Sequence, residues 1–337
     1  MYSLWLVGGT FLNRKNLPPL MKFVVTGGAG FIGSHLAEAL VEKGEVVVVD
    51  NFSFGSEWNV SDIRDKITLV DADISDKEKM REALQGADIV FHHAALRAVA
   101  PSVKDPKAYY ENNVLGSRAL FEVAVEVGVK KIIFASSSSI YGDKVSFPTK
   151  ETDVTDPLSP YAETKLQTEK DLQELGKKHN IPYVIFRYFT VFGTRQNPKS
   201  KYAMLISIFI NKLLNKERPT VYGDGEQSRD FTYVKNVVQA NLLAIDTNKA
   251  DNHIINIANG GTTSVNELFE KLSAIIGVNV EALHGDGQPG ESRKTFADIS
   301  LAKELLGYNP KYSMEEGLRE TVSYYQEIKK IEKNGAN

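Results

Sequence analysis

The 337-residue chain contains no cysteine. Disulfide bonds and thiolate metal sites are therefore excluded, and the composition fits a reducing compartment. The chain also lacks an excess of either charge sign, since 40 Lys and Arg residues stand against 43 Asp and Glu residues, for a formal net charge of −3. Without a basic stripe, the sequence does not carry the electrostatic signature of a protein that binds nucleic acid.

Long hydrophobic runs are missing as well. No run reaches the roughly 18 apolar residues that a membrane span requires. The first twenty residues have no basic segment, no long apolar run and no small-residue cleavage site, so they do not resemble a secretory signal. Pro18 and Pro19 break the chain before a strand-like run that begins at Met21. We therefore interpret residues 1–20 as an extension and expect a cytoplasmic protein without a membrane partner.

From Met21 onward, short β-branched runs alternate with stretches that have helical spacing. The predicted strands are residues 22–26, 45–50, 66–73, 88–94, 130–136 and 182–188. This alternation predicts an α/β fold with a doubly wound (Rossmann) parallel sheet. After Tyr188, loops rich in Gly, Asn and Arg predict a smaller C-terminal substrate-binding lobe. We expect a nucleotide-binding domain at 21–188, to which part of 230–260 returns, and a lobe formed mainly by 189–330.

A glycine-rich turn, TGGAGFIGS, follows the first predicted strand and opens the first helix. Gly27, Gly30 and Gly33 permit a tight turn and a close approach of the backbone to a pyrophosphate at the helix N-terminus. Three glycines alone also occur in ordinary turns. Here, however, Asp50 ends the next strand, where a carboxylate can accept both ribose hydroxyls. No arginine adjoins Asp50 to receive a 2′-phosphate, so the pattern favours NAD over NADP.

The third predicted strand ends in Asp73 and Ile74, which could border the adenine. Asp73 could equally be an acid that caps the following helix. Two adjacent histidines, His92 and His93, could suggest a metal site. In a strand they point to opposite faces, so packing and loop contacts are favoured over metal binding.

Four consecutive serines, Ser136 to Ser139, end another predicted strand, and Tyr161 and Lys165 follow in a helix. Positions i and i+4 share one helix face. A free phenol has a pKa of about 10. We expect Lys165 and a positively charged nicotinamide to favour the phenolate, which would make Tyr161 a base near neutral pH. A Tyr-x-x-x-Lys pattern is also common by chance as a surface pair, and its weight comes from the serine-tipped strand before it.

From Met21 to about Tyr325, the chain resembles the extended short-chain dehydrogenase/reductase family and, within it, the UDP-sugar 4-epimerases. The resemblance rests on TGGAGFIGSH, HHAAL, SSSSIYGD, SPYAETK, RYFTVFGTRQ, GDGEQSRDFTYV and FADISLAKELLGYNP. It implies tightly held NAD, a UDP-sugar substrate and a transient 4-keto intermediate. It also implies a homodimer through a four-helix bundle, with the helices containing 113–127 and 161–177 as the candidates.

The resemblance also implies roles for single residues. Ser137 would share a proton with Tyr161, and Lys165 would tune Tyr161 and hold the nicotinamide ribose. The implied cofactor residues are Gly27, Gly30, Phe31, Ile32, Gly33, Asp50, Asn51, Asp73, Ile74, Ala94, Asn113, Tyr161 and Lys165.

Ser138 and Ser139 distinguish among the relatives of this family. Sugar-nucleotide 4,6-dehydratases carry Asp-Glu at these two positions, and UDP-glucuronate decarboxylases keep a Glu at the second. Both positions are hydroxyls here, so no additional acid and base serve an elimination. The resemblance therefore implies oxidation at C4, rotation of the keto sugar and return of the hydride to its other face.

For the nucleotide sugar, the resemblance implies that Arg229 holds the diphosphate, as bidentate guanidinium geometry favours. A surface salt bridge with Asp230 is the ordinary alternative for this arginine. Tyr222 would pack near the uracil, and Arg195 would lie at the mouth of the site. Ser138 and Ser139 would line the pocket.

Two positions depart from the commonest epimerase pattern. Thr190 replaces an Asn that contacts substrate, and Gln288 replaces an Arg near the diphosphate, for which Arg293 could substitute. Thr295 aligns near the position that gates the sugar 2-substituent. A small residue there predicts that UDP-GlcNAc and UDP-GalNAc are accepted beside UDP-glucose and UDP-galactose.

Two alternatives remain. Thr190 also occurs in UDP-glucuronate 4-epimerases, but their Arg-Pro-Asp-Met continuation is absent at residues 197–200, which read NPKS. A non-catalytic dinucleotide-binding regulator is the alternative from another class. The presence of Ser137, Tyr161 and Lys165 together argues against it, because a sensor does not need a proton relay.

Overall fold

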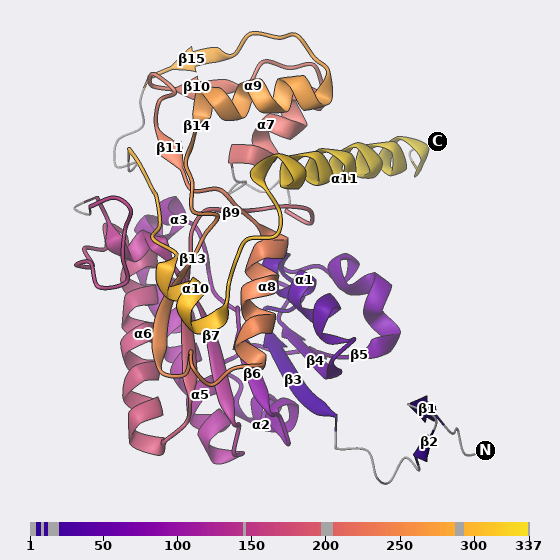
Figure 1. The fold of residues 1–337 in the computed structure, drawn as a ribbon, viewed down its shortest axis with the longest axis vertical. Coiled ribbons are helices and arrows are strands. Elements are labelled where there is room, and N and C mark those ends of the chain that lie inside the picture. Colours follow the sequence, from indigo (N-terminus) through magenta and orange to yellow (C-terminus); the bar gives the residue numbers. More distant parts are fainter. Residues whose placement is uncertain are drawn as a thin grey trace.

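A computed structural model of the protein describes residues 5–7, 10–12, 20–143, 146–196, 205–286 and 293–335. At its centre, seven parallel strands have the order β13-β8-β7-β6-β3-β4-β5 (Figure 1). The predicted doubly wound sheet is confirmed. The strands are β3 (Met21–Thr26), β4 (Gly44–Asp50), β5 (Ile67–Asp71), β6 (Ile89–His92), β7 (Lys131–Ser137), β8 (Tyr183–Tyr188) and β13 (His253–Ile257).

Both faces of this sheet are buried, which explains the continuous β-branched runs. In β4, Val46 and Val48 belong to one apolar cluster and Val47 and Val49 to another, because successive side chains alternate between faces. One face is covered by α1 (Phe31–Leu40), α8 (Val234–Ile245) and α10 (Ser300–Leu306). The other is covered by α2 (Lys77–Leu84), α5 (Ser117–Glu126) and α6 (Pro160–His179).

The segment between β6 and α5 is irregular. Two short helices, α3 (Val99–Lys104) and α4 (Pro106–Tyr109), lead into a π-helix, η3 (Tyr110–Gly116), which continues as α5. The sequence predicts that residues 113–127 belong to one helix, and the structure divides this helix into η3 and α5. A π-helical turn is uncommon and is frequently found at functional sites.

Helix α6 has clear signals at both ends. The Ser159 hydroxyl accepts the N–H of Ala162 at 3.2 Å, and Pro160 occupies the first turn, where its missing N–H costs nothing. Asn180 closes the helix in the left-handed conformation with φ 54°. These caps fix the register that presents Tyr161 and Lys165 on one face.

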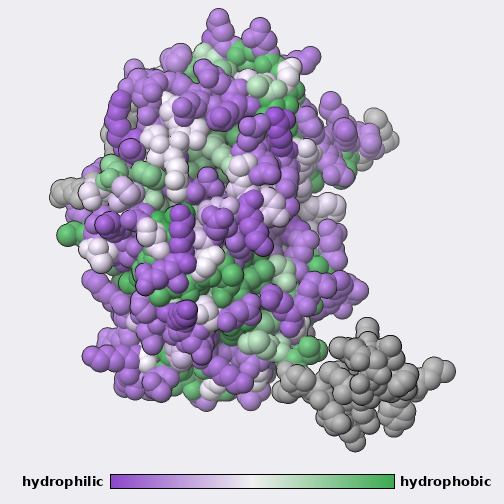
Figure 2. All heavy atoms as spheres, in the orientation of Figure 1, coloured by the Kyte–Doolittle hydropathy of each residue, from purple (hydrophilic) through white to green (hydrophobic). Residues whose placement is uncertain are grey.

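The second lobe stands above the carboxyl ends of the strands (Figure 1). Helices α7 (Leu205–Leu214), α9 (Val265–Ile276) and α11 (Met314–Gly335) share an apolar core there. Figure 2 shows that hydrophilic residues cover most of the visible face. The strands of this lobe are two or three residues long: β9 (Val191–Phe192), β10 (Thr220–Tyr222), β11 (Ser228–Arg229), β12 (Thr232–Tyr233), β14 (Thr263–Ser264) and β15 (Leu283–Gly285).

The remaining elements are the short strands β1 (Trp5–Val7) and β2 (Thr10–Leu12), which pair antiparallel, and the 3₁₀ helices η2 (Glu57–Lys66) and η4 (Ser138–Tyr141). Among the described helices, none is both long and apolar enough to cross a bilayer. The division of the chain into domains at residue 188 stays a prediction. Segments after it do return to the sheet, as α8, β13 and α10 show.

Candidate active site

A cavity of about 810 Å³ lies at the carboxyl ends of the central strands, where open α/β sheets bind their ligands. It runs from Lys165 and Tyr161, past the glycine turn, to Asp50 and Ile74. Of the predicted cofactor residues, all but Asn113 line it: Gly27, Gly30, Phe31, Ile32, Gly33, Asp50, Asn51, Asp73, Ile74, Ala94, Tyr161 and Lys165.

The glycine turn is built for close backbone approach. Gly27 has φ +65°, and a Cβ atom there would lie 2.7 Å from the amide nitrogen of Ala94. At Gly33, a Cβ atom would lie 2.2 Å from the carbonyl oxygen of Gly27. These positions exclude any side chain, and they open the N-terminus of α1 toward the cavity. A pyrophosphate fits this turn because main-chain N–H groups and the helix dipole both favour an anion.

Asp50 lies at the end of β4 with its carboxylate held by the main chain. Its two oxygens accept the N–H groups of Ala29 at 3.0 Å and Phe52 at 2.9 Å. Burial raises the pKa of Asp50, and these hydrogen bonds oppose that effect. The carboxylate is therefore fixed in the cavity wall.

Asp73 borders the same end of the cavity. Its carboxylate accepts hydrogen bonds from Asn51 at 2.8 Å and from the hydroxyl of Ser75 at 2.6 Å. Burial opposes ionisation of Asp73, but these hydrogen bonds outweigh it and lower its pKa. The N-cap of α2 is Asp76, whose side chain accepts the N–H of Lys79. The sequence allows two roles for Asp73, at the border of the adenine or as the cap of the following helix. Its position in the cavity wall favours the first.

Asn113 is 2% exposed, and its side chain hydrogen-bonds the main chain of a residue in the cavity wall. Its amide accepts the N–H of Leu96 at 2.8 Å and donates to the carbonyl of Leu96 at 3.0 Å. It also donates to the hydroxyl of Thr164 at 3.1 Å. Its neighbour Asn112 lines the cavity instead. The π-helical turn thus places one Asn in the wall and the other behind it, and direct contact of Asn113 with the cofactor stays a prediction.

The four serines have different positions. Ser136 is buried on β7, and its hydroxyl donates a short hydrogen bond to Glu169. Ser137 ends the strand, where its oxygen accepts the N–H of Ser139 at 3.2 Å and lies 3.0 Å from the Ser139 hydroxyl. Ser138 and Ser139 begin η4 and are half-buried. Ser136 therefore lines the cavity from within the strand, and the other three serines lie at the carboxyl edge of the sheet.

Burial raises the pKa of Tyr161, while the Ser137 hydroxyl and the positive charge of Arg97 act in the opposite direction. The sequence predicts that Lys165 provides the nearby positive charge. In the structure, Arg97 lines the cavity together with Tyr161 and its charge favours the phenolate, and no sequence motif marks this residue.

Lys165 lies one helical turn beyond Tyr161 and is 4% exposed. Its ammonium donates to the carbonyl of Ala135 at 2.8 Å and lies 4.8 Å from the ring centre of Phe134. Burial lowers the pKa of Lys165 to about 7, and Glu169 opposes the shift. The ammonium is thus held at the end of β7, in the cavity that Tyr161 also lines.

The two adjacent histidines have separate partners. The ring of His92 lies 2.7 Å from the hydroxyl of Thr26 and 2.8 Å from that of Ser117. His93 lines the cavity and contacts the hydroxyl of Tyr188 at 3.2 Å. Burial and the charge of Lys165 lower the pKa of His93 to about 3, so this ring is neutral.

Behind the catalytic candidates lies a buried ion pair. Arg187 on β8 bonds both oxygens of Glu169 on α6, at 3.1 and 2.7 Å, and both side chains are at most 4% exposed. Arg187 also donates to the hydroxyl of Tyr141 at 3.0 Å, which in turn donates to Asn256 at 2.6 Å. The network ties α6 to β8, η4 and β13. It fixes the distance between the serine-tipped strand and the helix that carries Tyr161.

The substrate candidates lie in the second lobe. Arg229 is half-buried on β11, and one of its guanidinium nitrogens donates to the carbonyl of Ser228 at 3.0 Å. Thr295 pairs with the same segment, since its N–H donates to Ser228 and its hydroxyl accepts the N–H of Asp230 at 3.3 Å. Arg229 and Thr295 thus lie on paired segments of this lobe.

Asp230 anchors these paired segments. Its buried carboxylate accepts N–H groups from Asn259 at 3.0 Å, Gly260 at 3.2 Å and Ala297 at 3.3 Å. Burial raises the pKa of Asp230 to about 7, against these hydrogen bonds. The sequence alternative of an Arg229–Asp230 surface pair does not fit this carboxylate, which is fully buried and bonded to main-chain amides.

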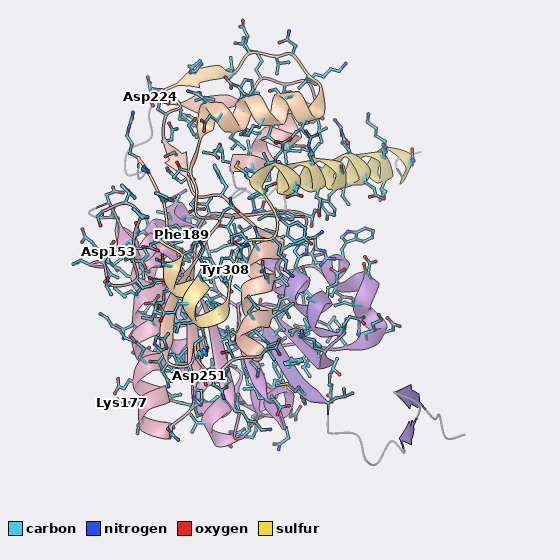
Figure 3. The ribbon with its side chains drawn as sticks, in the orientation of Figure 1. Asp153, Lys177, Phe189, Asp224, Asp251 and Tyr308 are labelled. Atoms are coloured by element: carbon cyan, nitrogen blue, oxygen red, sulfur yellow. The ribbon has the colours of Figure 1, made fainter. Side chains whose placement is uncertain are left out.

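The outer substrate candidates are more exposed. Tyr222 is 42% exposed, and Arg293 pairs with Asp224 at 2.5 Å on the surface. Figure 3 shows Asp224 at the outer edge of this lobe, well away from Phe189 at the top of the sheet. The charge that Arg293 could bring in place of Gln288 is therefore shared with an acid. Gln288 lies outside the described residues, as do residues 197–200, and the side chain of Thr190 is half-buried beside β9.

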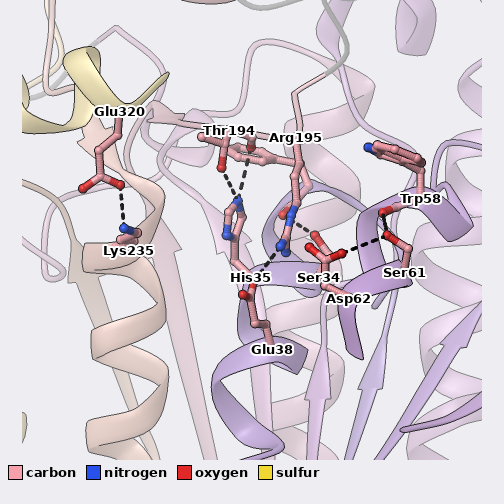
Figure 4. Close-up of polar contacts among 11 residues, drawn as sticks. Ser34, His35, Glu38, Trp58, Ser61, Asp62, Thr194, Arg195, Lys235 and Glu320 are labelled. Atoms are coloured by element: carbon pink, nitrogen blue, oxygen red, sulfur yellow. Dashed lines mark hydrogen bonds and ion pairs between the residues drawn. The ribbon is translucent and has the colours of Figure 1, made fainter. Parts of the chain in front are cut away.

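Arg195 lies on the cofactor side. Its guanidinium bonds Glu38 of α1 at 2.6 Å, and the neighbouring Thr194 bonds the ring of His35 (Figure 4). Arg195 has φ +64°, and it lines the cavity. The structure thus places it beside the helix of the glycine turn, and a role for it at the mouth of the substrate site stays a prediction.

These features define a nucleotide-cofactor enzyme whose polar groups converge beside a tyrosine and a lysine. The sequence of residues 23–258 matches the NAD dependent epimerase/dehydratase family. The chain belongs to this family, whose members use NAD.

Three solved structures resemble the chain over nearly its whole length. A UDP-glucose 4-epimerase from Thermotoga maritima, crystallised with UDP-glucose, is 40% identical, with a TM-score of 0.87 over 91% of this chain and 99% of its own. A UDP-N-acetylglucosamine 4-epimerase from Methanobrevibacter ruminantium M1 is 38% identical, with a TM-score of 0.88 over 92% and 100%. A UDP-glucuronic acid 4-epimerase from Bacillus cereus, crystallised with UDP-glucuronic acid and NAD, is 35% identical, with a TM-score of 0.84 over 91% and 100%. UDP-sugar 4-epimerases of three sugar classes are thus similar to this chain.

Proposed function

We propose that the protein is an NAD-dependent UDP-hexose 4-epimerase that interconverts UDP-glucose and UDP-galactose and also accepts UDP-GlcNAc and UDP-GalNAc. The observation that carries the proposal is the placement of Tyr161 and Lys165 in the cavity wall, with the Ser137 hydroxyl acting on the phenol. A proton acceptor thus lies in the same cavity in which a dinucleotide fits. Similarity to 4-epimerases of known structure supports the reaction class.

NAD held by the glycine turn, Asp50 and Lys165 would supply a hydride acceptor and later return the hydride. Tyr161, as phenolate, would accept the proton of the sugar 4-hydroxyl as the C4 hydrogen leaves as hydride. Ser137 would hydrogen-bond the same oxygen and orient it. After the keto sugar turns over, Tyr161 would return the proton to the oxygen when hydride is added to the opposite face.

The hydroxyls of Ser138 and Ser139 favour this reaction over elimination. A dehydration needs one group to take a proton from carbon and another to protonate the leaving hydroxyl. Unperturbed serine hydroxyls do neither near neutral pH. The same positions can hydrogen-bond the keto sugar in both orientations, which epimerisation requires.

The size of the accepted 2-substituent is inferred from Thr295. Thr295 lies on the segment that pairs with the strand of Arg229. A threonine at this position leaves more room than a large aromatic residue. We therefore expect N-acetylhexosamines to be substrates beside the neutral hexoses. A UDP-uronate epimerase is the second candidate, supported by Thr190 and by similarity to the Bacillus cereus enzyme.

A homodimer is part of the proposal. Exposed apolar side chains gather on the segments next to α5 and α6, the helices proposed to form the bundle: Val99, Val103, Tyr110, Leu115 and Leu158. Burial of this apolar surface in a second copy would stabilise the pair. Sedimentation velocity tests the proposal, and a monomer at high protein concentration would contradict it.

The reaction is tested with purified protein and no added cofactor. UDP-glucose, UDP-GlcNAc and UDP-glucuronate are offered separately and followed by proton NMR. We expect a new anomeric signal of the galacto product with the first two and none with the third. Epimerisation of UDP-glucuronate alone would support the second candidate. No change in any tube, with NAD supplied, would rule out the proposed reaction.

Tyr161→Phe is the matched control, because it removes only the phenolic oxygen. We expect kcat to fall by about 10³-fold, within the range for loss of a general base. The content of bound NAD should not change. A variant that kept full activity would point instead to the non-catalytic regulator.

A further inference from the structure

Arg97 is a cavity residue without an assigned role. It follows β6 in the loop before α3, is half-buried, and lines the cavity together with Tyr161. No carboxylate pairs with it within the part of the chain that the structure describes. A guanidinium cannot give up its proton in a protein, so a permanent positive charge faces this cavity.

The backbone at Arg97 is held in an uncommon shape. Ala98 has φ +85°, a conformation that residues other than glycine rarely adopt. The hydroxyl of Tyr109 lies 2.5 Å from the carbonyl oxygen of Arg97 and 3.1 Å from that of Ala98. Tyr109 is 5% exposed. A buried phenol therefore secures a strained turn, and strain that the surrounding structure maintains is a recognised feature of functional sites.

The same tyrosine contacts the catalytic candidate. The rings of Tyr109 and Tyr161 meet edge to face with centres 6.4 Å apart. One residue thus holds the turn that carries Arg97 and packs on the ring whose oxygen Arg97 influences. This coupling fixes the backbone of Arg97 relative to the ring of Tyr161, and both residues line the same cavity.

The other groups around Tyr161 leave a need for such a cation. Lys165, on the same helix, directs its ammonium to the carbonyl of Ala135. Ser137 acts on the phenol through a neutral hydroxyl. His93 and Tyr188 line the same cavity and are uncharged near neutral pH. Among these groups, Arg97 brings the one charge that remains full at every working pH.

We propose that Arg97, held in place by Tyr109, is a positioning residue that stabilises the Tyr161 phenolate, the form that takes the proton of the substrate. The proposal deepens the proposed function and rests on it for the role of the phenolate. The charge effect itself is a property of the folded protein and does not depend on which sugar is bound.

The test compares two substitutions in the NAD-bound protein. Arg97→Met removes the charge and keeps an apolar stem, whereas Arg97→Lys keeps the charge. The ionisation of Tyr161 is read from near-ultraviolet phenolate absorbance, as the difference between each protein and its own Tyr161→Phe counterpart. Arg195→Met is the control arginine, because Arg195 lines the same cavity but is paired with Glu38.

We expect Arg97→Met to raise the apparent pKa of Tyr161 by about one pH unit, as loss of a nearby opposite charge does. Arg97→Lys should shift it by less than half as much, and Arg195→Met should not shift it. The kcat of Arg97→Met should be about tenfold lower near neutral pH and should recover as the pH rises. A merely structural role would lower kcat equally at every pH.

An unchanged titration of Tyr161 in Arg97→Met overturns the proposal. If that variant does not fold, Tyr109→Phe replaces it, since this change keeps the ring and removes the hydroxyl that secures the turn. A shift in the same direction, smaller than one pH unit, supports the proposal, and no shift overturns it. A shifted titration in a protein that epimerises no UDP-sugar would leave the charge effect standing and contradict only the proposed reaction.

Discussion

The two halves of the site are built in different ways. On the cofactor side, the functional groups stand at the ends of long parallel strands, and main-chain amides fix them, as Ala29 and Phe52 do for Asp50. On the substrate side, they stand on strands of two or three residues and on exposed loops, as Tyr222 and Arg293 do. The first half is preformed, and the second depends on contacts between distant segments.

The difference has a physical consequence for binding. A preformed half loses little conformational entropy when its ligand binds, so it suits a cofactor that remains bound through many turnovers. The second half can accommodate a substrate that enters, turns over and leaves. Three substitutions test this contrast, and they are described from the largest expected effect to the smallest.

Gly33→Ala should have the largest effect. Its Cβ would lie 2.2 Å from the carbonyl oxygen of Gly27, and both atoms belong to the rigid turn. We expect loss of copurifying NAD and a fall of about 1–3 kcal/mol in the free energy of unfolding, as for overpacked sites. Absorbance of released cofactor and denaturant unfolding measure both.

Gly261→Ala is the matched control, because a Cβ there meets nothing within 4 Å. It should keep the cofactor and the stability of the parent protein. Normal NAD content in Gly33→Ala would show that the turn can relax, and the cofactor half would then not be rigid as described.

Arg229→Ala should weaken substrate binding without affecting the cofactor. Loss of a charged hydrogen bond to a phosphate costs about 1.5–3 kcal/mol, so KM for the UDP-sugar should rise by about 10–100-fold. Arg293→Ala should change KM much less, because Arg293 is exposed and paired with Asp224. Steady-state kinetics with both variants decide this, and an equal effect of the two would contradict the ranking.

Asp230→Asn should have the smallest effect on cofactor and substrate binding, and its effect should appear as a pH dependence of stability. The pKa of Asp230 in the folded protein, about 7, is above its ordinary value of 3.8. Its contribution to stability is therefore complete below pH 3.8 and is lost as the pH rises through about 7. We expect the free energy of unfolding of the parent to fall relative to that of Asp230→Asn between these values. Denaturant titrations at several pH values measure it, and parallel pH curves for the two proteins would contradict the assignment.

Much of the first half could be predicted from sequence. Buried parallel strands have continuous β-branched runs, and a glycine that faces backbone at 2.2 Å has no substitute, so both leave strong local signals. All six predicted strands therefore occur in the sheet. Twelve of the thirteen predicted cofactor residues line the cavity.

The features that the sequence did not predict depend on contacts and backbone geometry that leave no pattern in the neighbouring residues. Arg97 acts on Tyr161 across a loop and a helix, and only the folded chain brings the two together. The π-helical turn at Tyr110–Gly116 reads as ordinary helix, since it keeps the same residue types. Burial also raises the pKa of Tyr161, an effect that the sequence does not reveal because it shows neighbouring charges but not the loss of solvent.

The buried pair of Arg187 and Glu169 has a consequence for how this sequence can change over time. Removal of either partner strands a charge inside the protein and costs about 3–5 kcal/mol, whereas exchange of both for apolar residues can be nearly neutral. The two sites are therefore epistatic, and single-step mutational paths between the charged and apolar versions pass through a poorly folded intermediate. Ser136 and Tyr141 share the same bonds and join this constraint. This buried cluster thereby limits how far the sequence of the helix that carries Tyr161 can change.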